Sequence, residues 1–173
     1  MRMINPLCTV LTRRPEAAAF LNGSEKYKEI RGQVFFYELV DSVLVRAEVS
    51  GLPKGKGNCD DPIFAFHIHE GTQCSGTSED PFSDAGMHYS PEHCPHPYHA
   101  GDLPPLLGAD GSAVLVFLTN RFRIWEIIGK TVIIHAKPDD FMTQPSGNSG
   151  GISSAIIFPL WYGEHPLRLL GKR

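Results

Sequence analysis

Hydrophobic residues alternate with polar ones in short runs along the chain, which is the pattern of β-strands that bury one face. The clearest run is 43–49, where valines and an alanine occupy every second position. The run 33–40 precedes it, and Asp41 and Ser42 between the two runs predict a hairpin turn. Further strands are expected in four runs: 63–69, 112–118, 131–135 and 156–158.

Two long stretches, 70–105 and 137–151, have no regular hydrophobic period and are rich in Gly, Ser, Asp and Pro. Loops of this length in a compact domain are usually functional. The helical signal is limited to a single turn at 124–128. The pattern therefore predicts an all-β fold, a sandwich or barrel that carries its chemistry on two long loops.

Composition narrows the class of protein. The chain has 173 residues, which is typical of one domain, and 42% of them are hydrophobic. A net charge of −3 leaves no basic field for nucleic acid, and no apolar run approaches the length that spans a membrane. The first residues show no secretory signal, which favours a cytoplasmic protein. The four cysteines form no CxxC pair, so a cysteine-based zinc site is not expected.

Histidines carry the clearest chemistry. His67 and His69 alternate with Phe66 and Ile68, so on a strand both imidazoles project from one face while the apolar side chains face a core. Two surface histidines on a half-exposed strand would give the same pattern. The pair alone is therefore weak evidence for a metal site.

A second histidine-rich group strengthens that evidence. It contains His88, His93, His96, His99 and Asp102, with prolines between them. Imidazole nitrogens and carboxylate oxygens suit zinc, although a Pro- and His-rich loop can also be solvated and bind metal adventitiously. Asp102 leads back into packed chain, which favours an ordered site.

Two further residues extend the set. His135 closes the strand 131–135 and is a candidate ligand beside His67 and His69, and Asp139 is placed to orient ligating imidazoles. A nitrogen-rich site favours Cu(II), whereas three histidines and an aspartate favour Zn(II). Copper would permit one-electron transfer, whereas two zinc ions would indicate hydrolysis or structure.

The order of these motifs resembles the copper/zinc superoxide dismutases. The matching segments are 66–70, 86–91, 99–103, 129–136, 139–140 and 147–151, within a region of about 17–151. The resemblance implies a Greek-key β-barrel of immunoglobulin-like architecture, with a zinc-bearing loop and an electrostatic loop beside the copper. We therefore expect an N-terminal extension at 1–16, a dismutase-like domain at 17–158 and a divergent tail at 159–173.

Residue roles follow from the same resemblance. Three histidines match the copper ligands: His67, His69 and His135. His88 matches the imidazole that bridges both metals, and His99 and Asp102 match zinc ligands. His96, next to the secure ligand His99, is preferred to His93 as the remaining zinc ligand. Asp139 matches the aspartate that links a copper ligand to a zinc ligand.

The implied reaction is the disproportionation of superoxide to oxygen and hydrogen peroxide. His88 is the expected catalytic residue, because it would leave the copper, take up a proton and deliver that proton to the second superoxide. An anionic substrate needs local positive potential in a negatively charged protein, and Lys137 is the candidate to supply it. Dimers are common in the family, but the sequence identifies no interface.

The chain departs from the family after Gly151. Members usually have an arginine that guides superoxide and then a cysteine in a disulfide. An ungapped alignment puts Ile152 and Ala155 at these positions, whereas deleting the arginine puts Ser154 at the cysteine. Both groups are absent in either alignment.

Two consequences follow from this loss. Cys74 resembles the other half of the disulfide, and its pairing with Cys59 or Cys94 stays open. Two functions also stay open: a dismutase with slower anion capture, and a copper/zinc-binding protein with little or no dismutase activity. A zinc hydrolase is disfavoured because no general-base carboxylate is evident beside the metal.

Overall fold

The computed structural model describes residues 6–57, 62–144 and 150–160. The elements in chain order are α1 (Pro6–Leu11), β1 (Ala17–Gly23), the 3-10 turn η1 (Glu25–Tyr27), β2 (Arg31–Glu38), β3 (Val43–Ser50), β4 (Ile63–Phe64), β5 (Phe66–His69), the 3-10 turn η2 (Ser83–Ala85), β6 (Leu106–Leu107), β7 (Ser112–Thr119), α2 (Ile124–Ile127), β8 (Thr131–His135), β9 (Gly151–Ile156) and β10 (Phe158–Pro159).

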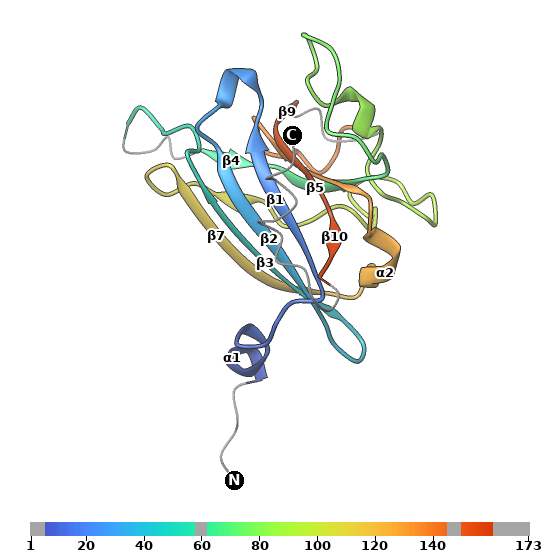
Figure 1. Ribbon diagram of the computed structural model, residues 1–173. Helices are drawn as coiled ribbons and strands as arrows, with labels where there is room; N and C mark the ends of the chain where they lie inside the picture. The colour runs from blue at the N-terminus through green and yellow to red at the C-terminus, as the bar shows by residue number, and fades with distance from the viewer. Residues whose placement is uncertain (1–5, 58–61, 145–149, 161–173) are drawn as a thin grey trace, which may run out of the picture.

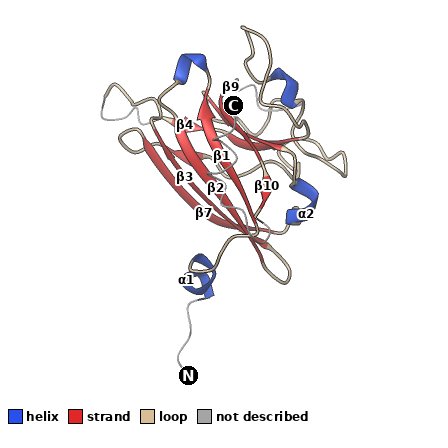
Figure 2. Cartoon of the chain, in the orientation of Figure 1, coloured by secondary structure: helices blue, strands red, loops and turns tan. Residues whose placement is uncertain are grey.

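The strands form a curled antiparallel sheet of eight strands and a separate pair, β4 with β6. The order in the large sheet is β5-β8-β9-β1-β2-β3-β7, with β10 beside β1. Strand β9, late in the chain, therefore lies against the first strand, and long connections emerge to one side of the sheet (Figures 1 and 2). This arrangement confirms the predicted all-β fold.

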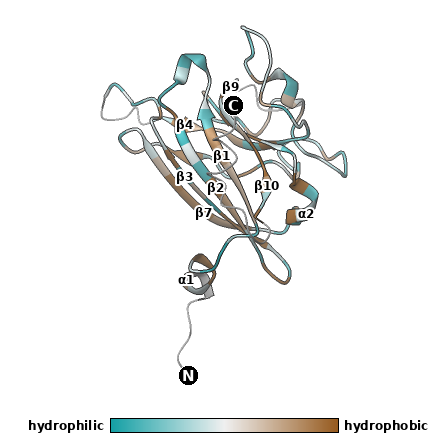
Figure 3. Cartoon of the chain, in the orientation of Figure 1, coloured by the Kyte–Doolittle hydropathy of each residue, from teal (hydrophilic) through white to brown (hydrophobic). Residues whose placement is uncertain are grey.

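Alternation in β3 places its side chains as expected. Val43, Val45, Ala47 and Val49 are all buried in one large core cluster. Phe36 of β2 and Phe66 of β5 are fully buried in the same cluster. Hydrophobic residues accordingly concentrate along the strands, and hydrophilic ones in the connections (Figure 3). Each large apolar side chain buried in this way contributes roughly 1.5–3 kcal/mol to folding.

Strand β1 was not expected from the sequence. Its first three residues are alanines, which have little strand preference of their own. They are fully buried, and the strand pairs with β2 on one side and with β9 and β10 on the other. Tertiary pairing therefore decides the conformation here.

Two other expectations need correction. The expected strand 63–69 is broken at Ala65, because Phe64 pairs with Leu106 while Phe66 pairs with Ile134 in a different sheet. Strand β9 begins at Gly151, within the segment expected to be a loop. Its buried serines hid the pattern, and one of them, Ser153, donates a hydrogen bond to the Asn22 carbonyl at 3.0 Å.

Helix α1 covers part of the outer face of the sheet. Its Val10 packs against Tyr37 and Leu44, which point away from the main core. This contact explains why Leu44 is only 1% exposed although its neighbours in β3, Val43 and Val45, face the main core. Within the described residues, neither α-helix has the length and apolar character needed to cross a bilayer.

Candidate metal centre

The long loop 70–105 is tied to the edge of β5 by backbone hydrogen bonds. The Ile68 N–H donates to the Gly101 carbonyl at 2.9 Å, and the Tyr89 N–H donates to the Ile68 carbonyl at 2.8 Å. Bridge pairing sets His69 opposite His88 and His67 opposite Asp102. The loop is thereby held so that its histidines meet those of the strand.

Gly101 makes this close approach feasible. A Cβ at that position would lie 2.1 Å from the carbonyl oxygen of Ile68. Only a residue without a side chain allows the loop to run this near the strand.

Four buried histidines form the first group: His67, His69, His88 and His135. One ligand atom from each lies within 4.8 Å of the others, and Nε2 of His69 is 3.3 Å from Nε2 of His135. Three nitrogens in this group are buried without a hydrogen-bond partner: His67 Nδ1, His88 Nε2 and His135 Nδ1. Unpaired buried polar atoms are costly, so the set fits a metal ion, and its all-nitrogen donors suit copper.

Burial keeps these imidazoles in the form that binds metal. It lowers the pKa of His69 to about 3, and it lowers the pKa of His135 well below the usual value for histidine. The pKa of His67 is also lowered, again chiefly by burial. Neutral imidazole is the ligating form, so all three residues are ready to bind metal at neutral pH.

The second group contains His88, His96, His99 and Asp102, and all four are buried. Oδ2 of Asp102 lies 3.1 Å from His96 Nδ1 and 3.3 Å from His99 Nδ1. Neither nitrogen has hydrogen-bond geometry with it, although both are buried. Donors that converge in this way without bonding to each other fit an ion between them, and three imidazoles with one carboxylate suit zinc.

Asp102 is held as a carboxylate. Burial alone would raise its pKa, but the hydrogen bond to His88 and the neighbouring imidazoles outweigh burial and lower the pKa. Its Oδ2 also accepts a hydrogen bond from the His99 N–H at 2.9 Å. The ionised form is the one that binds a cation.

His88 belongs to both groups. Its Nδ1 lies 2.7 Å from Asp102 Oδ1, whereas its Nε2 is buried without a partner. The ring centroid is 3.9 Å from that of His67 in the first group and 5.6 Å from that of His96 in the second. One imidazole therefore offers a separate nitrogen to each group.

Asp139 joins the two groups a second time. Its Oδ2 lies 2.9 Å from His67 Nε2, and its Oδ1 lies 2.8 Å from His96 Nε2. Burial would raise its pKa, but hydrogen bonds from His67, the Phe141 N–H and His96 outweigh burial and lower the pKa. The carboxylate accepts a hydrogen bond from each Nε2, which leaves both Nδ1 atoms free for metal.

The structure thus brings together every expected ligand and Asp139. His93 is exposed and lies outside both groups, which fits the preference for His96. Lys137 is exposed and is not among the described residues that line the cavity over the first group.

Two residues that hold the second group were not expected from the sequence. Arg121 donates from Nη1 to the carbonyls of Pro97, His99 and Asp102 at 3.1–3.2 Å. Gln144 accepts a hydrogen bond from the His96 N–H at 3.1 Å and donates to the His96 carbonyl at 2.7 Å. Both bind backbone atoms, so no local motif marks them.

A cavity of about 450 Å³ opens over the first group. His69, His88 and His135 lie in its wall. The other described lining residues are Asp80, Phe82, Ser83, Gly86, Met87, Ile133, Gly150 and Gly151. None of these is a lysine or an arginine, and one is an acid.

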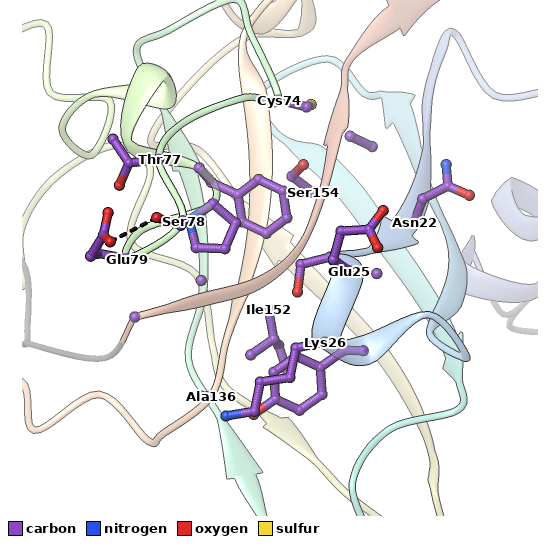
Figure 4. Close-up of a pocket in the computed structure, with 18 of the residues that line it drawn as sticks. Asn22, Glu25, Lys26, Cys74, Thr77, Ser78, Glu79, Ala136, Ile152 and Ser154 are labelled. Carbon is purple, nitrogen blue, oxygen red and sulfur yellow. Dashed lines mark hydrogen bonds between the residues drawn. The ribbon is translucent and has the colours of Figure 1, made fainter.

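A larger groove of about 910 Å³ lies beside this cavity and contains Cys74 and Ser154 (Figure 4). Ile152 and Ala155 also line this groove, but both belong to the main core cluster, whereas Ser154 does not. This placement favours the alignment in which the arginine is deleted and Ser154 takes the place of the cysteine.

The cysteine pairing is partly settled. Cys74 and Cys94 are both free thiols, so the pairing of Cys74 with Cys94 is not found. Cys59 itself lies outside the described residues, and with Cys74 free the pairing of Cys74 with Cys59 is not found either.

Comparison with known proteins agrees with this geometry. Residues 30–156 match the sequence profile of the family described as copper/zinc superoxide dismutase (SODC). The chain is 36% identical over 132 residues to "Superoxide dismutase [Cu-Zn]" of Deinococcus radiodurans, covering 66% of this chain and 69% of that protein. It is 30% identical over 137 residues to "Superoxide dismutase [Cu-Zn] 2" of Aquifex aeolicus, covering 70% and 75% respectively.

Proposed function

Because this chain belongs to the copper/zinc superoxide dismutase family, we propose that it disproportionates superoxide at a copper ion held beside a zinc ion. Two superoxide anions and two protons give one molecule of oxygen and one of hydrogen peroxide. The observation that carries the proposal is the position of His88, whose two ring nitrogens face the two groups of donors.

The donor sets divide between the two metals. Copper would be held by His67, His69, His88 and His135, and zinc by His88, His96, His99 and Asp102. Copper supplies one-electron oxidation and reduction, whereas zinc has no redox chemistry and supplies fixed positive charge.

His88 also has the position of an acid–base residue. The residue lines the cavity, and its Nε2 has no partner among the described protein groups. A proton held on this atom can therefore pass to a superoxide that has entered the cavity. Asp102 fixes the ring from its other side through Nδ1, so the orientation of Nε2 is set before substrate arrives.

The absence of a cation from the described cavity lining favours a second candidate, a metal-binding protein of the same fold with little or no dismutase activity. Both candidates need the same ligands. They differ in whether superoxide reaches the copper.

Reconstitution distinguishes the two. The protein is prepared metal-free, with zinc alone and with both metals, and superoxide decay is followed by stopped-flow absorbance. Dismutase activity requires catalysed decay in the copper-containing sample alone, with oxygen and peroxide formed in equal amounts. His135→Ala should lose copper and activity together, whereas His93→Ala, on the exposed loop, should retain both. Stoichiometric copper without catalysed decay would favour the binding protein.

We also propose a cytoplasmic location and a homodimer, as expected from the sequence and the family. The free thiols of Cys74 and Cys94 are consistent with a reducing compartment. Sedimentation equilibrium of the purified protein tests the dimer.

A further inference from the structure

The cavity over the first group of histidines has a negatively charged residue in its lining. The cavity over the first group is lined by Asp80 and by the apolar side chains of Phe82 and Met87, beside His69, His88 and His135. Superoxide is an anion, so a carboxylate at this place opposes its entry.

Asp80 is not neutralised by a neighbour. The residue is exposed, and no described lysine or arginine forms an ion pair with it. Its Oδ1 accepts a hydrogen bond from the Phe82 N–H at 3.3 Å, which fixes the carboxylate at the cavity wall. Glu79 and Asp84 on the same segment add to the negative charge.

The position of the charge makes it effective. A cleft with low-dielectric walls focuses the field of the charges at its mouth, and such fields change association rates of small ions by an order of magnitude or more. Part of the wall here is apolar, because Phe82, Ile133 and Met87 line the cavity beside the imidazoles. Lys137 is exposed but does not line the cavity, so its field acts from farther away.

We propose that Asp80 limits the access of anions to this cavity, by setting a negative potential that slows the entry of superoxide and of other small anions. For superoxide the inference rests on the proposed function. For other anions it rests on the cavity and its metal donors alone.

The test uses the copper- and zinc-loaded protein and three variants. Asp80→Asn removes the charge and keeps an oxygen to accept the Phe82 N–H. Asp80→Lys reverses the charge. Asp41→Asn is the matched control, because it changes the net charge by the same amount in the exposed turn between β2 and β3, away from the cavity lining.

Two readouts are measured for each protein. The first is the dissociation constant of azide, a small anion, from the absorption spectrum of the bound copper. The second is the second-order rate constant for superoxide decay. Both are followed as sodium perchlorate is raised from about 10 mM to about 200 mM, a range in which screening shortens from tens of ångströms to below about 10 Å.

We expect Asp80→Asn to tighten azide binding and to speed superoxide decay by roughly two- to tenfold at low salt, with a larger effect for Asp80→Lys. Wild-type protein should bind azide more tightly as salt rises, because salt screens repulsion, and Asp80→Lys should show the opposite slope. Asp41→Asn should behave as wild type. Equal behaviour of Asp80→Asn and Asp41→Asn, or tighter azide binding by wild type at low salt, would overturn the proposal.

The two readouts separate this proposal from the proposed function. The protein could bind azide in a way that depends on Asp80 and yet fail to disproportionate superoxide. This result would refute the dismutase function and support the role proposed for Asp80. Catalysed decay of superoxide with no effect of Asp80 on either readout would support the dismutase function and refute the role proposed for Asp80.

Discussion

Nδ1 of His88 lies 2.7 Å from Oδ1 of Asp102 in the second group, and this contact fixes a ring whose other nitrogen faces the histidines of the first group. Asp102 is therefore both a donor for the second group and the residue that orients the link between the groups. Asp139 connects the two groups a second time, because its carboxylate accepts one hydrogen bond from His67 and another from His96. The two groups are thus built as one unit, and a change at either link should affect both.

His96 and His93 lie three residues apart in the same loop, and their substitution should have different effects. His96→Ala removes a buried donor and should lower zinc content and affinity by at least about tenfold. His93→Ala changes an exposed residue outside both groups and should leave zinc content unchanged. Zinc measured by mass spectrometry of the dialysed proteins decides this, and zinc loss in His93→Ala would reverse the assignment.

Asp139→Asn should weaken the binding of both metals. The amide can accept one of the two imidazole hydrogen bonds but not both, so either His67 or His96 loses its orientation. Losses of about 10–100-fold in metal affinity are typical for such outer partners. Competition with a chelator measures both constants. Asp140→Asn, at the neighbouring exposed acid, is the control, and equal losses in the two variants would contradict a role specific to Asp139.

Ser154→Cys should form a disulfide with Cys74 under oxidising conditions, because the two residues line the same groove. The cross-link should raise the free energy of unfolding by about 2–4 kcal/mol. Denaturant unfolding of oxidised and reduced protein measures the difference. The double variant Cys74→Ser with Ser154→Cys should show no such difference. A thiol that stays free at position 154 after oxidation of the single variant would refute the alignment.

Gly101→Ala should loosen the loop that carries the second group. Its Cβ would approach the Ile68 carbonyl to 2.1 Å, so the loop must move from β5. We expect a loss of about 1–3 kcal/mol in stability, together with weaker zinc binding. Gly57→Ala is the matched control, because no atom of the described residues lies within 4 Å of the added Cβ. Unchanged zinc affinity in Gly101→Ala would show that the close approach is not needed.

The extent to which sequence predicted this structure depends on where each signal lies. Alternation in β3 and in the segment of His67 and His69 is local, and both were placed on the correct faces. Strand β1 was missed because its alanines become a strand only through partners distant in sequence.

The same distinction holds for the site. The histidines could be found because their type and order carry the chemistry. Arg121 and Gln144 could not, because they bind carbonyl and amide groups that any residue offers. Asp80 lies in a loop without a regular hydrophobic period. Its place in the lining of the cavity can be found only from the structure.

The most direct test of the dismutase function is the decay of superoxide with the wild-type protein carrying one copper and one zinc per chain. A chelator that captures free copper is present, so the decay reports the bound metal alone. The proposal predicts catalysed decay whose rate is proportional to protein-bound copper. Fully loaded protein that removes superoxide no faster than the metal-free chain would contradict it.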